Sequence, residues 1–329
     1  MMDIAVGLPI PDRMAPAYAY WAAAAALGYD RAEGFAFRFF YAGTPLKTAD
    51  ALAQGRCRFA PLNVTVGFLA HARGQALCAV YSSSRRAHRW FAVPPASPIR
   101  VLADLAGKRV TCDFADLWPL AESALAEERV DPRTLVRVPW QGSGMAVREM
   151  VGPFRRGEVD AVFVIDWNHG DFIAEGLPMR RLPSKLMDRA ETSSCLWTMP
   201  DAVDDPIVGR VGRALAKATL FSLLNPEAVI RLMWESHPDT RPAPAGRDRE
   251  LRRGVEILKA RTDTMRPEGA RDPRWGAILA DEMSEAADHL ARANAIPARP
   301  DSAVLFDQTH LAAFNAFDPR SVEEDARHA

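Results

Sequence analysis

The chain has 329 residues, of which 48% are hydrophobic and 25% are charged, so its main state is folded rather than disordered. Its 41 Lys and Arg residues nearly balance 42 Asp and Glu residues, and the formal net charge of −1 argues against nucleic-acid binding. No stretch approaches the roughly 20 apolar positions that a membrane span needs. We therefore expect a soluble protein that does not insert into a membrane.

Short strands alternate with helices through the first third of the chain. Helices are expected at residues 15–27 and 44–54, because each pattern is followed by a glycine, Gly28 or Gly55, that suits a left-handed helix end. Apolar, β-branched and aromatic residues predict strands at 3–8, 35–41, 59–62 and 77–81. Strands that alternate with helices indicate an α/β fold.

The alternation resumes after the proline-rich stretch 94–98 and then gives way to helices. The tail at 321–329 is polar and is expected to fray. The central part predicts strands at 109–112, 135–138 and 159–165 and helices at 117–129 and 146–155. The last third predicts helices at 207–224, 227–235, 247–262, 275–294 and 311–316.

The four cysteines, Cys57, Cys78, Cys112 and Cys195, lie far apart and show no zinc-ligand spacing. We therefore expect no metal site, and we interpret the cysteines as small buried residues, although the spacing leaves a disulfide open. The first residues lack the basic and apolar regions of a signal peptide, so either the protein is cytoplasmic or a signal was removed.

Three short motifs carry a family resemblance. They are Leu-Ala-Asp-Leu-Ala-Gly-Lys-Arg-Val at 102–110, Gly-Glu-Val-Asp-Ala at 157–161 and Phe-Asn-Ala-Phe-Asp at 314–318. With the α/β alternation, they resemble the type II periplasmic solute-binding proteins of ABC importers, in the group that contains nitrate, sulfonate and thiamine-pyrimidine-precursor binders.

The resemblance implies an α/β fold of two lobes, each with a mixed, mostly parallel sheet flanked by helices. It places residues 1–98 and 196–329 in one lobe and residues 99–195 in the other, with hinge crossings near 94–104 and 191–199. It implies a small-molecule ligand and the membrane permease of an ABC transporter as partners, a monomer, no cofactor, no catalytic residue and a location outside the cytoplasm if a signal was removed.

Two departures from the family pattern bear on the ligand. Arg58 replaces the acid that usually follows the glycine at this position, and the loop after Val110 carries Asp113 and Asp116 instead of small hydroxyl residues. Carboxylates repel an oxyanion, whereas hydroxyl and N–H donors hold one. We therefore expect neither nitrate nor a simple sulfonate.

The candidate ligand-binding residues lie in turns that follow strands, where helix N-termini present unpaired N–H groups. Trp118, Trp140 and Trp167 would stack on a planar ring, and Asp116 and Asp166 would accept its N–H groups. The alternatives are that the tryptophans pack in the core and that Asp166 caps a helix. The full set is Asp12, Thr44, Asn63, Tyr81, Ser83, Asp116, Trp118, Trp140, Gln141, Asp166 and Trp167.

A basic cluster, Arg85, Arg86, His88 and Arg89, precedes Trp90. We interpret it as an exposed, solvated turn; alternatively, one of its arginines meets an anionic group of the ligand.

The resulting hypothesis is a binding protein that captures a small, nitrogen-containing heteroaromatic solute, such as a thiamine-pyrimidine precursor, by lobe closure. The alternative is a cytoplasmic enzyme on the same fold, with decarboxylase-like or desulfinase-like chemistry. A desulfinase-like site needs a reactive cysteine, and Cys57 and Cys78 lie in or beside predicted strands, where burial disfavours the thiolate.

Overall fold

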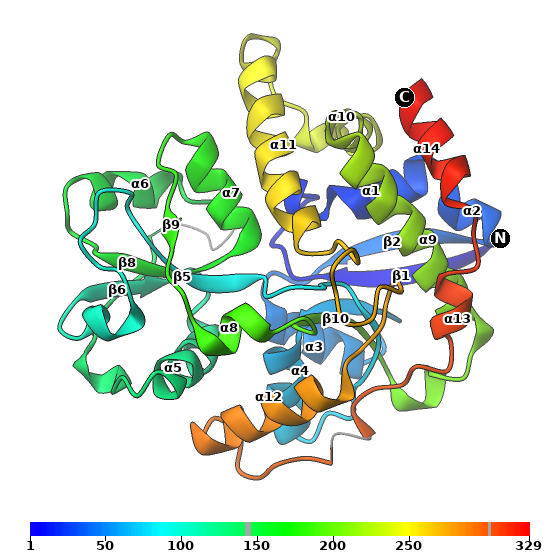
Figure 1. Ribbon diagram of the computed structural model, residues 1–329. Coiled ribbons are helices and arrows are strands. Elements are labelled where there is room, and N and C mark those ends of the chain that lie inside the picture. The colour runs from blue at the N-terminus through cyan, green and yellow to red at the C-terminus, as the bar shows by residue number, and fades with distance from the viewer. Residues whose placement is uncertain (142–145, 302–303) are drawn as a thin grey trace.

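The computed structural model describes residues 1–141, 146–301 and 304–329. The strands of the protein fall into two groups (Figure 1). In the first group, β1 (Met2–Leu8) pairs in parallel with β2 (Phe35–Tyr41). A parallel bridge between Val6 and Phe59 connects β1 to a three-stranded sheet. That sheet has the order β3 (Ala60–Asn63), β10 (Ser194–Thr198), β4 (Cys78–Ser82), and β10 is antiparallel to both neighbours.

The second group is a mixed five-stranded sheet. Its three parallel strands are β7 (Val136–Val138), β6 (Arg109–Cys112) and β8 (Ala161–Ile165). Strand β5 (Arg89–Val93) is antiparallel to both of its neighbours, β8 and β9 (Arg180–Arg181), and the order of the sheet is β7-β6-β8-β5-β9. The predicted α/β class with mixed sheets is therefore confirmed.

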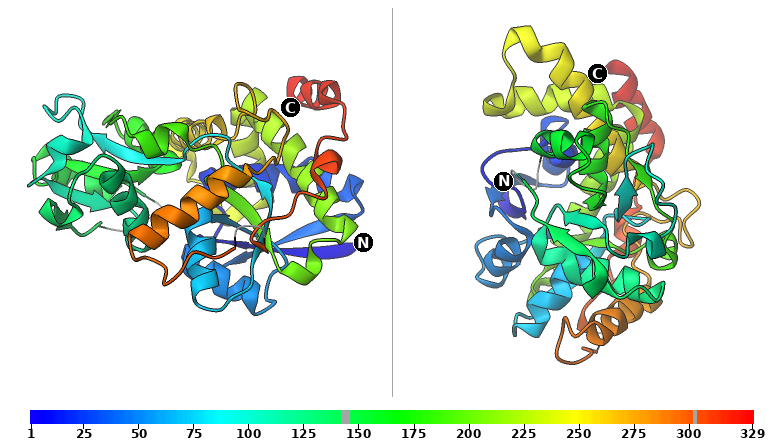
Figure 2. Two further views of the ribbon diagram at one scale, coloured as in Figure 1. Left: turned by 60° about the horizontal axis from the view of Figure 1, so that its bottom comes forward. Right: turned by 90° about the vertical axis from the view of Figure 1, so that its left-hand side faces the viewer.

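Helices cover both groups of strands (Figures 1 and 2). Those nearest the first group are α1 (Ala19–Ala26), α2 (Tyr29–Ala32), α3 (Pro45–Ala53), α4 (Val64–Ala72), α9 (Pro206–Leu224), α10 (Pro226–Ser236), α11 (Arg247–Asp263), α12 (Ala280–Arg292), α13 (Leu311–Phe314) and α14 (Pro319–His328). Those nearest the second group are α5 (Trp118–Glu127), α6 (Arg148–Arg155), α7 (Asp166–Ala174) and α8 (Lys185–Arg189).

The chain changes sheets twice. It leaves the three-stranded sheet after β4 and enters the five-stranded sheet at β5, so the first change lies within residues 83–88. It returns between α8 and β10. The sequence places the first crossing near 94–104, but Arg89–Val93 already pairs with β8, because its apolar side chains are buried on both faces of that sheet.

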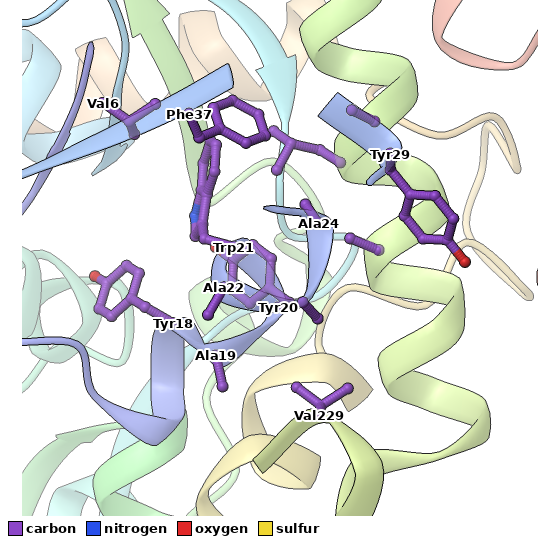
Figure 3. Packing of buried hydrophobic residues seen from close by; sticks show 14 of the residues in the cluster. Val6, Tyr18, Ala19, Tyr20, Trp21, Ala22, Ala24, Tyr29, Phe37 and Val229 are labelled. Atoms are coloured by element: carbon purple, nitrogen blue, oxygen red, sulfur yellow. The ribbon is translucent and has the colours of Figure 1, made fainter. Parts of the chain in front are cut away.

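The largest hydrophobic cluster lies between β1, β2 and the helices α1, α9 and α10 (Figure 3). Its aromatic centre is Trp21, whose ring meets the Phe37 ring edge-on at 5.2 Å between centroids. Four alanines of α1, Ala19 and Ala22–Ala24, are buried, which lets the helix approach α9 and α10 closely. An Ala-rich segment at this position is therefore a core helix.

The prediction that the C-terminal tail frays is wrong. Residues predicted to fray form α14, which begins after Asp318, whose side chain accepts from the Arg320 N–H. Val322 is fully buried, and the Tyr29 hydroxyl donates to the Asp325 carboxylate over 2.7 Å. Asn225 Nδ2 also donates to the Ala326 carbonyl over 3.0 Å. One fully buried apolar residue and two long-range hydrogen bonds therefore hold this polar helix against the rest of the molecule, which local composition did not reveal.

Among the described residues, no helix is both long and apolar enough to span a bilayer. The described part of the chain also contains no cluster of His, Cys, Asp and Glu that would hold a metal ion.

Candidate functional site

A cavity of about 380 Å³, here called the polar cavity, lies where the two groups of strands meet. Residues at or just after the carboxyl ends of β1, β2, β3, β6 and β8 line it, together with residues at the starts of β5 and β10. Helix α11 contributes Arg261. Three aromatic side chains, Tyr18, Phe114 and Trp167, form part of its wall. The Trp167 ring lies 5.6 Å from the Tyr18 ring and 6.4 Å from the Phe114 ring, between centroids.

Arg89, at the start of β5, is one of two buried arginines in this wall. Its Nη1 donates to Asp113 Oδ1 over 2.6 Å. The other Asp113 oxygen accepts from the Ile165 N–H at 2.9 Å and from Asn168 Nδ2 at 3.0 Å. The Asp113 carboxylate is therefore occupied inside the protein and does not face a ligand as a free acceptor.

Arg261, on α11, is the second buried arginine, and its Nη1 donates to Asp166 Oδ2 over 3.1 Å. Asp166 also accepts from the Trp167 N–H at 2.7 Å and from Thr264 Oγ1 at 2.9 Å. Burial raises the pKa of Asp166, although Arg261 opposes this shift. Burial alone would lower the pKa of Arg261, but Asp166 and two tyrosines raise it, so the guanidinium keeps its charge.

Several donors around the polar cavity remain unused. Within the described residues, Arg89 Nε, Arg261 Nε and Trp167 Nε1 are buried and have no hydrogen-bond partner. A buried donor without a partner costs free energy, so a ligand that accepts hydrogen bonds would be stabilised here. The cavity is rich in donors, and its carboxylates are already paired.

His88 forms part of the wall, and both of its ring nitrogens are engaged in hydrogen bonds. The Ser193 hydroxyl donates to the Arg86 carbonyl over 3.0 Å, which leaves its oxygen to accept from His88 Nδ1 at 2.6 Å. His88 Nε2 then accepts from Asn63 Nδ2 at 3.1 Å, because Asn63 Oδ1 accepts from the Thr65 N–H. Burial, with Arg261 and Arg89, keeps the pKa of His88 well below its ordinary value.

A second cavity, of about 640 Å³, adjoins the polar cavity. We call it the apolar cavity, because Val64, Leu120, Leu186, Met187 and Leu290 form most of its apolar wall. Asn63, His88 and Arg89 line both cavities. These three side chains therefore form a partition between a donor-rich space and an apolar one.

Three of the predicted ligand residues lie at or beside the polar cavity. Asn63 and Trp167 line it, and Asp166 lies behind its wall, paired with Arg261. Asp166 also accepts a hydrogen bond from the Trp167 N–H at the start of α7. This contact resembles the helix cap that was its alternative role. Thr44 caps α3 by accepting from the Lys47 N–H, and it precedes Pro45 in the wall.

The other predicted polar residues lie elsewhere. Tyr81 packs in the core against the Phe314 ring, and Ser83 donates to the Ser194 carbonyl. Asp12 lies at a separate surface cavity, and Asp116 and Gln141 are exposed. The structure thus does not bring these five side chains together.

The three tryptophans are also separated in the described part of the molecule. Trp118 packs on one face of the five-stranded sheet, 4.6 Å below the Arg137 guanidinium. Trp140 packs on the opposite face, with its ring 6.3 Å from Phe172. Only Trp167 reaches the polar cavity, so the structure does not form the aromatic enclosure that all three were expected to build.

The interpretation of the basic cluster as a solvated turn is wrong. Arg85, His88 and Arg89 are buried, and only Arg86 is exposed. Arg85 donates to the backbone carbonyls of Ala277 and Asp272, which explains its burial. The missed signal is the run Arg-Trp-Phe-Ala-Val, which forms β5 and draws Arg89 into the interior.

Arg261, Tyr18 and Phe114 were not predicted as site residues. Arg261 comes from a helix far along the chain, and its burial depends on a partner 95 residues away. Nothing near Arg261 in the sequence distinguishes it from the exposed arginines of the same helix.

The chain is related to a known protein family. The family model described as NMT1/THI5 like matches residues 15–229. The chain belongs to this family. The family resemblance expected from the three sequence motifs is thus confirmed. No curated protein matches the chain.

Solved structures show the same fold. The alkanesulfonate-binding protein SsuA from Xanthomonas axonopodis pv. citri, bound to MOPS, is 18% identical with a TM-score of 0.66, over 94% of this chain and 99% of that one. The aliphatic sulphonate binding protein SsuA from Escherichia coli is 16% identical with a TM-score of 0.68, over 94% and 92%. The desulfurization enzyme DszB is 14% identical with a TM-score of 0.60, over the full length of both chains.

Proposed function

We propose that this chain is the solute-binding component of an ABC importer and that it captures a small organic solute in the polar cavity. The observation that carries the proposal is the combination of an aromatic wall with unpaired buried donors, at strand ends where the two sheets meet. Binding proteins with this fold, including the two SsuA proteins, support the same role.

The solute we propose is a planar, nitrogen-containing heteroaromatic compound. Tyr18, Phe114 and Trp167 offer ring surface, and Arg89, Arg261 and Trp167 offer donors. Asp166 and Asp113 are saturated by the protein, so the ring need not bring N–H groups to them. A ring nitrogen, carbonyl or carboxylate of the solute would accept from the arginines instead.

Capture would occur by closure of two lobes, one formed by residues 1–82 and 194–329 and the other by residues 89–189. We place the first hinge at 83–88, where the chain changes sheets, and the second at its return before β10. Closure would seal the solute from water and strengthen its hydrogen bonds to the buried arginines. A monomer outside the cytoplasm, docking on a membrane permease, completes the proposal.

The enzyme alternative has less support in the site. All four cysteines are free and buried, and burial raises their pKa values to about 11 for Cys57 and about 12 for the other three. None is a thiolate at neutral pH, so none is an activated nucleophile. Both ring nitrogens of His88 are engaged, which leaves it no free position for general-base work.

A thermal-shift and calorimetric screen tests the proposal. The panel contains pyridine and pyrimidine compounds, with nitrate and taurine as simple oxyanions. We expect a heteroaromatic member to raise Tm, because a ligand at 100 times its Kd adds about 2.7 kcal/mol of stability. Trp167→Ala should weaken its binding about tenfold or more.

Trp118→Ala is the matched control, because Trp118 lies outside the cavity wall. It should leave the affinity unchanged. Tight binding of taurine or nitrate that Trp167→Ala does not affect would contradict the proposed solute class. Steady conversion of the bound solute to a product would favour the enzyme alternative.

A further inference from the structure

The apolar cavity is larger than the polar one, and its walls come from both groups of elements. Val64 is on α4 and Leu290 is on α12, whereas Leu120 is on α5 and Met187 is on α8. Helix α12 contacts both α4 and α5 (Figures 1 and 2). The cavity therefore lies at the meeting of the two units, as the polar cavity does.

The apolar side chains of its wall are not packed fully against one another. Protein cores are filled almost completely, and few voids exceed the size of a water molecule. Here the apolar side chains surround a space, partly open to solvent, that is larger than the polar cavity. Apolar side chains that border an empty space lack van der Waals contacts on that side, and they gain these contacts when an apolar group enters.

The carboxylates at the border of the apolar cavity are already paired. Glu282 accepts from the N–H groups of Glu191 and Thr192 at 2.7 and 2.6 Å, and Arg271 also pairs with it. Glu285 pairs with Arg189. A charged ligand group would have to displace one of these partners, so the chemistry favours an uncharged occupant.

His289 also borders the cavity and is engaged with charged neighbours. Its Nδ1 lies 2.9 Å from Arg292 Nη2, and its Nε2 lies 3.4 Å from the Glu285 carboxylate. Burial and Arg292 lower the pKa of His289, although Glu285 opposes this shift. The border thus offers an incoming charge no unoccupied partner among these residues.

We propose that the apolar cavity holds an uncharged alkyl or aryl arm of the solute whose polar head lies in the polar cavity. The inference rests on the proposed function, and it names the solute class as amphipathic. The arm would pass from one cavity to the other beside the three side chains that line both, Asn63, His88 and Arg89. The arm is favoured because it buries apolar area, and each buried methylene raises the affinity about fourfold.

The first experiment measures the arm directly. Calorimetry compares pyridine-3-carboxylate with its 6-propyl and 6-hexyl derivatives, which share one heteroaromatic, acceptor-bearing head. We expect the affinity to rise at least tenfold from the parent to the propyl compound and further to the hexyl compound. A parent that binds with no gain from either arm would overturn the inference and leave the proposed function intact.

Ala286→Leu tests the location of the arm. Ala286 lies in the cavity wall on α12, so a larger side chain would occupy the space. It should remove most of the gain from the hexyl arm and leave the affinity for the parent compound unchanged. Ala280→Leu, at an exposed position of the same helix outside this wall, is the matched control and should change neither. Equal effects of the two substitutions would contradict the assigned location.

A second probe separates this inference from the proposed function. Xenon is uncharged and needs no polar head, so crystals under xenon pressure should show an atom in the apolar cavity of the wild type and none in Ala286→Leu. An apolar cavity that stays empty of xenon would overturn the inference. Xenon binding, together with no affinity for any heteroaromatic head, would leave the apolar site standing and remove the proposed function.

Discussion

Two helix contacts join the five-stranded sheet and its helices to the rest of the molecule, and they are built in opposite ways. Helix α7 packs tightly on α11: a Cβ added to Gly170 would lie 2.6 Å from the Glu256 backbone oxygen. On the other side, α12 faces α5 and α8 across the apolar cavity. The contact between α7 and α11 is closely packed, whereas the contact of α12 with α5 and α8 encloses a cavity; we call them the tight and the hollow contact.

The ion pairs at the two contacts also differ: the pair at the tight contact is buried, and the pair at the hollow contact is exposed. Arg253 donates from two nitrogens to Asp171 at 2.6 and 2.8 Å, and the Asp171 side chain is 1% exposed. Arg189 pairs with Glu285 on the hollow side, where each side chain is 39% exposed. Buried pairs depend on both partners, whereas exposed pairs contribute little. We infer that α7 and α11 carry the stability of the junction, while the hollow side is free to adapt to a solute.

The largest effect is expected from Asp166→Asn at the tight contact. The change leaves Arg261 as a buried charge without its carboxylate, which should cost about 3–5 kcal/mol of unfolding free energy. Urea denaturation measures this loss. The double variant Asp166→Asn with Arg261→Gln should recover part of the stability, because it removes the unpaired charge. A loss below about 1 kcal/mol in the single variant would show that the pair does not hold this contact.

A smaller loss is expected from Gly170→Ala. Alanine favours a helix by about 1 kcal/mol over glycine, but the new methyl group would meet backbone, which cannot rotate away as a flexible side chain would. Overpacking of this kind costs about 1–3 kcal/mol, so we expect a net loss in urea denaturation. The control is Gly246→Ala, whose added Cβ meets nothing within 4 Å. A variant at Gly170 that is as stable as the control would contradict the close packing.

His88, in the partition between the cavities, should make stability depend on pH. Its pKa is lowered in the folded protein by burial and by two arginines, whereas the unfolded chain has the ordinary value of 6.5. As pH falls below about 6.5, the unfolded state therefore binds a proton that the folded state does not. This contribution is complete above that pH and is lost below it, by about 1.4 kcal/mol per pH unit.

The test compares urea denaturation of the wild type and of His88→Gln between pH 7 and pH 5. The wild type should lose more stability than the variant across this range. Parallel curves for the two proteins would mean that His88 takes up its proton as readily in the folded state as in the unfolded chain.

The smallest effect is expected from Arg189→Gln on the hollow side. An exposed ion pair contributes about 0–1 kcal/mol, so unfolding should change little. Arg253→Gln is the matched change on the tight side, and it should cost about 1–3 kcal/mol because it leaves the Asp171 carboxylate buried without its partner. Equal losses in the two variants would remove the distinction between the contacts.

Most of the regular elements were predictable because their signals are local. The strands at 35–41 and 109–112 lie at the predicted bounds, since each is a short apolar or aromatic run bounded by turn residues. The helix predicted at 275–294 begins only at Ala280. Strands β5 and β10 were missed, because their partners lie far along the chain and their pairing reverses the local direction.

The sequence alone determined the family and the alternation of strands and helices. It also determined two residues of the polar cavity, Asn63 and Trp167, because each lies at or just after the carboxyl end of a strand. Only the tertiary structure decided which charges are buried. Arg89 and Arg261 enter the interior because Asp113 and Asp166 meet them there, 24 and 95 residues away. A charge is buried only where a partner compensates its lost hydration, and that partner is set by the fold.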